Sequence, residues 1–81
     1  MYFVTSKKAG YVLFAMTPSG RAAIGLTEAQ QVRLFERDSS GDWHVLREWK
    51  VTDRSHTDVM LALGEHDEPA DPKQLLALLD T

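Results

Sequence analysis

The fold is decided by the stretch Trp43-His44-Val45-Leu46-Arg47-Glu48-Trp49-Lys50-Val51, which contains the clearest period-two pattern in the chain. Successive side chains of a β-strand point to opposite faces, so the odd-numbered residues would share one face and the even-numbered residues the other. Both tryptophans would then point the same way, with Arg47 between them. We therefore expect a strand over residues 43–51 that presents an indole-bearing face.

Turn signals on the N-terminal side of this stretch predict further strands. Asp38-Ser39-Ser40-Gly41-Asp42 is typical of a tight reversal, which would pair residues 31–37 with 43–51. Earlier apolar runs at 2–5, 11–16 and 21–26 are separated by turn signals at 6–10 and 17–20. The second of these turns has proline at its second position and glycine at its fourth, as in a type I turn.

Residues 27–30 allow two interpretations. Thr27-Glu28-Ala29-Gln30 matches a capping box at a helix start, and the following residues include good helix formers. Against this, Val32 and Leu34 alternate with polar residues in the next segment. We favour a short turn at 27–30 followed by a strand at 31–37.

The C-terminal third predicts two short helices. Asp58 to Leu63 reads as a helix ended by Gly64, and Asp71-Pro72 would begin a second helix as its N-cap and first residue. Glu65 to Pro72, with two prolines and four acids, would form an exposed loop. We expect one α+β domain over residues 1–81, with a mainly antiparallel sheet of four to five strands and both helices packed on one face. Its predicted core residues are Val12, Phe14, Leu34, Val45, Leu61, Leu75 and Leu79.

Length and composition favour a binding protein over an enzyme. A chain of 81 residues buries only roughly 60–65% of its unfolded surface, which leaves little room for a deep catalytic cavity. The absence of cysteine excludes disulfides and thiolate chemistry, and it fits a cytoplasmic location. The apolar run at 11–16 is far shorter than the ~20 residues that span a bilayer, so no membrane association is expected.

Charge is unevenly distributed along the chain. Residues 1–50 carry seven basic and five acidic side chains, whereas residues 51–81 carry two basic and seven acidic ones, for a net charge of −3. The front of the chain is therefore mildly basic and the back acidic.

The first candidate site lies on the predicted hairpin at 31–51. Trp43, Arg47 and Trp49, with Arg33 and Arg37 on the neighbouring strand, combine the residue types that dominate protein-interaction hot spots. The same combination suits stacking of single-stranded bases, although the negative net charge makes nucleic acid an unfavourable partner. A third interpretation is that the tryptophans belong to the core and Arg47 lies at its rim.

The second candidate site is the acidic segment formed by Glu65, Asp67, Glu68 and Asp71. Together with His56, Asp58 and His66 these carboxylates could suit a metal ion, but no recognised ligand spacing is present, so no metal or other cofactor is expected. Ser55-His56-Thr57-Asp58 contains the residue types of a nucleophilic site as immediate neighbours, whose side chains diverge. We expect no catalytic residue.

Two strand-and-turn units show a resemblance to a known family. Val12-Leu13-Phe14-Ala15-Met16-Thr17 leads into Gly20-Arg21 and Glu28-Ala29, and Val32-Arg33-Leu34-Phe35-Glu36 leads into Ser40-Gly41-Asp42. In this order of features the chain resembles the dinitrogenase iron-molybdenum cofactor-binding family of nitrogenase accessory proteins. The resemblance implies a ribonuclease-H-like fold and the carriage of a metal cofactor. Where that family usually has a His-Phe-Gly-like segment, this sequence has Gly25-Leu26-Thr27, without the histidine.

Taken together, the sequence favours a small non-enzymatic binding or regulatory protein, such as an accessory factor, an adaptor or an inhibitor. It would act on a larger protein partner and exist as a monomer or homodimer. The alternatives are a metal-cofactor carrier of the nitrogenase-accessory type and a weak binder of single-stranded nucleic acid.

Overall fold

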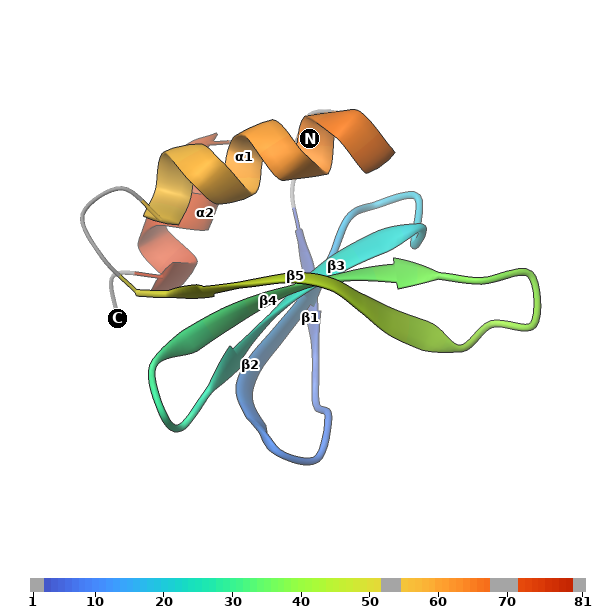
Figure 1. The fold of residues 1–81 in the computed structure, drawn as a ribbon, viewed down its shortest axis with the longest axis horizontal. Helices are drawn as coiled ribbons and strands as arrows, with labels where there is room; N and C mark the ends of the chain where they lie inside the picture. Colours follow the sequence, from blue (N-terminus) through green and yellow to red (C-terminus); the bar gives the residue numbers. More distant parts are fainter. Residues whose placement is uncertain (1–2, 52–54, 68–71, 80–81) are drawn as a thin grey trace.

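The computed structural model describes residues 3–51, 55–67 and 72–79, which form one antiparallel sheet and two helices. Each strand pairs with the one that follows it, so the order across the sheet is β1-β2-β3-β4-β5. Both helices lie on the same side of the sheet (Figure 1), as the sequence predicted. The elements are β1 (Val4–Ser6), β2 (Tyr11–Met16), β3 (Ala22–Thr27), β4 (Gln31–Arg37), β5 (Trp43–Lys50), α1 (Ser55–His66) and α2 (Pro72–Leu79).

The turns form where the sequence predicted them, and hydrogen bonds close two of them as follows. The Gly20 N–H donates to the Thr17 carbonyl at 2.9 Å, which closes the turn between β2 and β3. Between β3 and β4 the Gln30 N–H donates to the Thr27 carbonyl at 3.1 Å, and the Thr27 hydroxyl accepts from the Gln31 N–H at 3.2 Å. Thr27 therefore caps a turn and not a helix, which confirms the turn-and-strand interpretation of residues 27–37.

Helix α1 is longer than the sequence predicted. It begins at Ser55 and continues through Gly64 to His66, so the expected stop at Gly64 is wrong. The Asp67 N–H donates to the Leu63 carbonyl at 2.8 Å, which keeps the helical hydrogen bonding intact past the glycine. Glu65 and His66 therefore belong to α1 and not to an exposed loop. Helix α2 begins at Pro72, as predicted.

The main core lies between the sheet and the helices. It is built from small and branched side chains of β2, β3 and β4, which meet one face of α1, Leu75 of α2 and Phe3. Trp49 of β5 packs against it while remaining partly exposed. The buried members are Phe3, Ala15, Ala22, Ile24, Leu26, Val32, Leu34, Val59, Ala62, Leu63 and Leu75.

Three of the predicted core residues are exposed. Val12 is the extra residue of an irregularity between β2 and β3, which turns its side chain away from the core (59% exposed). Val45 lies on the edge strand (51% exposed). In α1 the 3.6-residue period directs Val59, Ala62 and Leu63 inward and leaves Leu61 outside (66% exposed).

The other core predictions have simpler outcomes. Phe14, Leu34 and Leu75 are buried, as expected. The side chain of Leu79 lies outside the described residues.

Helix α2 is tied to the start of the sheet by one side chain. The Phe3 N–H donates to Gln74 Oε1, and Gln74 Nε2 donates to the Phe3 carbonyl at 3.1 Å. Both polar groups of the Phe3 backbone are thereby paired, which lets its ring stay buried beneath the helices.

Candidate partner-binding face

A β-bulge places the two tryptophans on opposite faces of the sheet. In the β4–β5 pairing Leu34 lies opposite Arg47 and Phe35 lies opposite Val45, so Leu46 is an extra residue in β5. The bulge shifts the alternation by one position. Trp49 consequently packs on the helix side, while Trp43 contacts the opposite side, where it packs against Phe14 and Phe35. The prediction that both indoles share one face is wrong.

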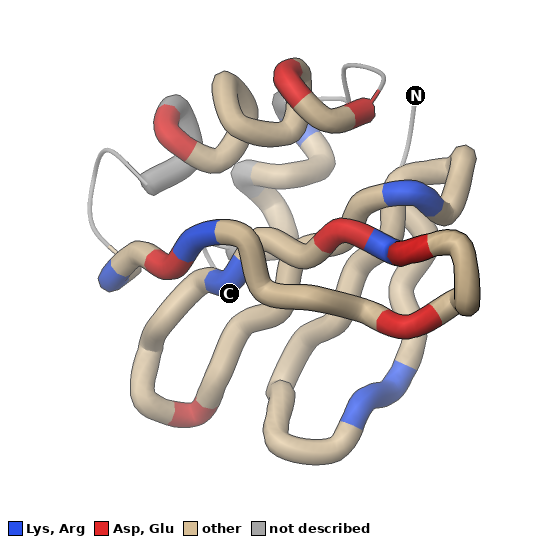
Figure 2. Tube along the Cα trace, turned by 45° about the vertical axis from the view of Figure 1, so that its right-hand side comes forward, with Lys and Arg blue, Asp and Glu red and all other residues tan. Residues whose placement is uncertain are grey.

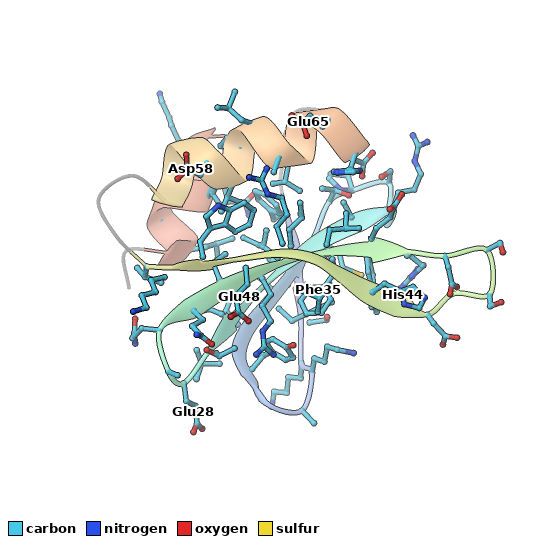
Figure 3. The ribbon with its side chains drawn as sticks, in the orientation of Figure 1. Glu28, Phe35, His44, Glu48, Asp58 and Glu65 are labelled. Atoms are coloured by element: carbon cyan, nitrogen blue, oxygen red, sulfur yellow. The ribbon has the colours of Figure 1, made fainter. Side chains whose placement is uncertain are left out.

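The side of the sheet away from the helices carries a row of aromatic rings, and we call this side the open face. Phe14 contacts Trp43 and Phe35 with centroids 5.5 and 5.4 Å apart, and Tyr11 contacts Phe35 at 5.5 Å. Figure 3 shows Phe35 and Glu48 projecting from this side, opposite α1. The open face includes Tyr11, Phe14, Met16, Ala23, Gly25, Gln31, Arg33, Phe35, Arg37, Trp43, Val45, Glu48 and Lys50, with Lys8 reaching over it.

Gly25 makes this ring packing possible. A Cβ atom at Gly25 would lie 2.7 Å from Tyr11 Cδ1 and 2.9 Å from Phe35 Cε2, closer than real contacts allow. The two rings therefore meet directly over the backbone of β3, at the one position there without a side chain. A glycine inside a strand often marks such a close approach.

Cations lie over three of the rings. The Arg37 guanidinium is 4.4 Å from the Trp43 centroid, Lys8 Nζ is 5.5 Å from that of Phe14, and the Arg33 guanidinium is 5.8 Å from that of Tyr11. The negative faces of aromatic rings attract such cations, so the rings hold the long side chains in place. The open face is thus aromatic beneath and cationic above.

The two arginines of the open face, Arg33 and Arg37, differ in their hydrogen-bond partners. Arg33 donates to Glu48 at 2.5 Å and to the Tyr11 hydroxyl at 3.1 Å, and these hydrogen bonds raise the pKa of its guanidinium above the ordinary value. For Arg37 the contacts within the described ranges are the Trp43 ring and a long approach of 4.0 Å to Met16 Sδ, and no described carboxylate forms an ion pair with it. Its donors remain open to an external acceptor.

The remaining predicted hairpin residues lie on the helix side. Arg47 is 5.1 Å from the Trp49 ring centroid, and Trp49 packs against the main core. The five residues predicted as one surface are therefore two groups. Arg33, Arg37 and Trp43 come together on the open face, and Arg47 and Trp49 form a separate pair.

The predicted acidic segment does not form one surface. Glu65 is exposed on α1, but the Asp67 side chain is fully buried beside the β2–β3 turn. There the Asp67 carboxylate accepts hydrogen bonds from the Thr17 and Ser19 hydroxyls and lies 3.7 Å from Arg21 Nε. Asp67 thus fixes the end of α1 to the sheet. Glu68 and Asp71 lie outside the described residues.

Of the candidate metal ligands that the structure describes, Asp58 and His66 lie far apart. Asp58 and His66 are eight residues from each other in α1, which separates them by ~12 Å along the helix axis. In the part of the chain that the structure describes, no three histidine, aspartate or glutamate side chains gather as a metal site would require. The side chains of residues 55–57, including His56, lie outside the described set.

The sequence analysis did not predict that Lys8, Tyr11 and Phe35 belong to the open face. It predicted Phe14 as a core residue but not as one of the rings of this face. Gly25 was the available signal, because an isolated glycine within an apolar strand indicates that something packs closely against it. The ring row itself depends on the pairing of four strands, β2 to β5, which the local sequence does not specify.

Comparison with known proteins yields no relatives. The chain matches no protein-family profile, no curated protein and no solved structure. The resemblance to the nitrogenase accessory family therefore stays a prediction. Neither α1 nor α2, as far as the described residues extend, has the length and apolar character of a membrane span.

Proposed function

We propose that this chain is a small non-enzymatic binding protein that holds a larger protein partner on its open face. The observation that carries the proposal is the Arg37–Trp43 pair, a guanidinium 4.4 Å from an indole on a sheet face that the helices leave uncovered. Tryptophan, tyrosine and arginine dominate interaction hot spots because they bury much surface and also donate hydrogen bonds. Trp43 and Tyr11 are both half-buried, so part of each ring is available.

The ring geometry favours a protein partner over single-stranded nucleic acid. Base stacking needs open ring faces. Phe14 and Phe35 are each only 3% exposed, and the Trp43 ring has Arg37 over it. The charge of Arg33 is offset by Glu48, which weakens the attraction for a phosphate backbone. Exposed Val45 beside the rings adds apolar surface of the kind that proteins bury on association.

The proposal is tested by affinity capture from native cells with matched variants. Val45→Asp and Arg37→Ala alter exposed positions of the open face without removing a ring, so we expect both to fold and to lose the partner. Arg47→Ala is the control, because Arg47 is also an exposed arginine over a tryptophan but lies on the helix side. Retention of the partner by Val45→Asp and Arg37→Ala, or its equal loss with Arg47→Ala, would refute the proposal.

A cytoplasmic location and a monomeric or homodimeric state belong to the same proposal. Fractionation of native cells checks the location, and light scattering of the purified protein checks the state.

A further inference from the structure

We propose that Arg37 and Trp43 form a receptor for a carboxylate side chain, so that the partner presents an acidic, extended segment to the open face. This inference rests on the proposed function and names the chemistry of the partner. It starts from the state of Arg37. Its guanidinium is positioned by the indole, and its contacts within the described ranges include no carboxylate.

The donor geometry of Arg37 suits a carboxylate. A guanidinium carries five N–H donors in a planar fork that matches the two oxygens of a carboxylate. Stacking on Trp43 restricts the side chain before binding, which lowers the entropy lost when the ligand arrives.

Two acids flank Arg37 in sequence, and both are directed elsewhere. Glu36 points to the other face, because its neighbours Phe35 and Arg37 both belong to the open face. The Asp38 carboxylate accepts hydrogen bonds from the turn backbone and pairs with His44.

The charge around Arg37 is the reverse of the charge on the rest of the protein. Among the described strand residues, the open face carries Arg33, Arg37 and Lys50, with Lys8 over it, against Glu48, in a chain whose net charge is −3. On the opposite side α1 carries Asp58 and Glu65 and no lysine or arginine (Figure 2). An acidic segment is therefore drawn to the open face and repelled from α1.

The distribution of charge also distinguishes the surroundings of Arg37 from those of Arg47. Arg47 also lies over a tryptophan, and no described carboxylate forms an ion pair with it. It lies, however, on the side of the sheet that α1 covers, where the neighbouring helix supplies negative charge. We expect an acidic ligand to discriminate between these two arginines.

A second cation, Lys8, indicates that the ligand is an extended segment with more than one carboxylate. Contacts of 4.4, 5.5 and 5.5 Å connect Arg37 through Trp43 and Phe14 to Lys8. In an extended segment, residues two and four apart point the same way and lie ~7 and ~13 Å from each other. We expect two carboxylates at such spacing to engage Arg37 and Lys8 together, whereas a compact single anion would engage one of them.

The test uses Trp43 fluorescence in a Trp49→Phe background, so that one indole reports on the open face. The probe is a synthetic peptide that alternates glutamate with serine, titrated at low salt. We expect a fluorescence change on binding, an affinity about tenfold or more weaker with Arg37→Gln, and a change below about twofold with Arg47→Gln. Arg37→Lys keeps the charge without the planar fork and should lie between wild type and Arg37→Gln.

Several outcomes would overturn the inference. They are equal binding by the Arg37→Gln and Arg47→Gln variants, equal binding of a lysine–serine peptide, and tighter binding of oligothymidylate than of the glutamate–serine peptide. Absence of any peptide binding also overturns it. If the natural partner is nevertheless lost from Val45→Asp, the binding function of the open face stands and only its acidic specificity fails.

Discussion

Replacing Gly25 by alanine should loosen the open face and destabilise the whole protein. The added methyl carbon would lie 2.7 Å from Tyr11 Cδ1 and 2.9 Å from both Tyr11 Cε1 and Phe35 Cε2. Phe35 cannot yield easily, because it is 3% exposed and its ring centroid lies 5.5 and 5.4 Å from those of Tyr11 and Phe14. A movement at Gly25 therefore disturbs all three rings.

The expected magnitude follows from two opposing effects. Inserting a methyl group into a packed cluster costs ~1–3 kcal/mol. Replacing glycine also restricts the unfolded chain, which returns ~0.4–1 kcal/mol. The net loss in the free energy of unfolding should be about 1–2 kcal/mol, and because ~1 kcal/mol shifts Tm by ~4–8 °C in a domain of this size, Tm should fall by roughly 5–15 °C.

Gly64→Ala is the matched control. Gly64 lies exposed within α1, and a Cβ atom there would meet no atom within 4 Å. The same substitution should therefore stabilise the protein by ~0.5–1 kcal/mol through helix propensity alone.

Urea unfolding followed by circular dichroism measures both variants under identical conditions. The two substitutions should change the midpoint in opposite directions. If Gly25→Ala is as stable as the unmodified protein while Gly64→Ala is stabilised, the rings do not close over β3 and the reasoning for the open face fails.

Three further predictions address other parts of the fold. Asp67→Asn should lower the free energy of unfolding by ~1–3 kcal/mol, because it breaks a buried, charge-assisted network; a loss below ~0.5 kcal/mol in urea titration would contradict this. The Asp38–His44 hydrogen bond raises the pKa of His44 and lowers the pKa of Asp38. Its stabilising effect should be largest between the ordinary values of ~4 and ~6.5, and should fade as pH rises through the raised pKa or falls through the lowered one. NMR titration of His44 should show a lower midpoint in Asp38→Asn, and an unchanged midpoint would disprove the coupling. Leu63→Ala should cost ~2–5 kcal/mol and Leu61→Ala less than ~0.5 kcal/mol, and similar thermal shifts for both would contradict the orientation of α1.

The strands and turns were predictable because their signals are local. Turn residues such as Pro18, Gly20 and Gly41 specify where the chain reverses, and the runs beside them have the length and the residue types of strands. The start of α2 at Pro72 is local for the same reason.

The composition of the candidate site was not predictable, because it depends on a single extra residue. Period-two alternation places Trp43 and Trp49 together, and only the bulge at Leu46 separates them. A bulge forms when strand pairing and packing on both faces favour it, and β5 itself contains no glycine or proline that would announce it. The exposure of Val12 has the same cause in β2.

The end of α1 was mispredicted for a different reason. Glycine stops a helix when it adopts a left-handed conformation, and Gly64 does not belong to the residues with positive φ. The burial of Asp67 against Thr17 and Ser19 favours continuation of the helix, and that contact spans about fifty residues of sequence. No local pattern reports it.

The nearest-neighbour order of the strands has a kinetic consequence. Each hairpin of the meander can close on its own and extend the sheet by one strand. Because closing a short loop costs little conformational entropy, sheet assembly should be rapid. The Gln74–Phe3 tie, by contrast, joins residues 71 positions apart. We expect this tie to form after the folding barrier, so that weakening it accelerates unfolding while the folding rate stays nearly constant.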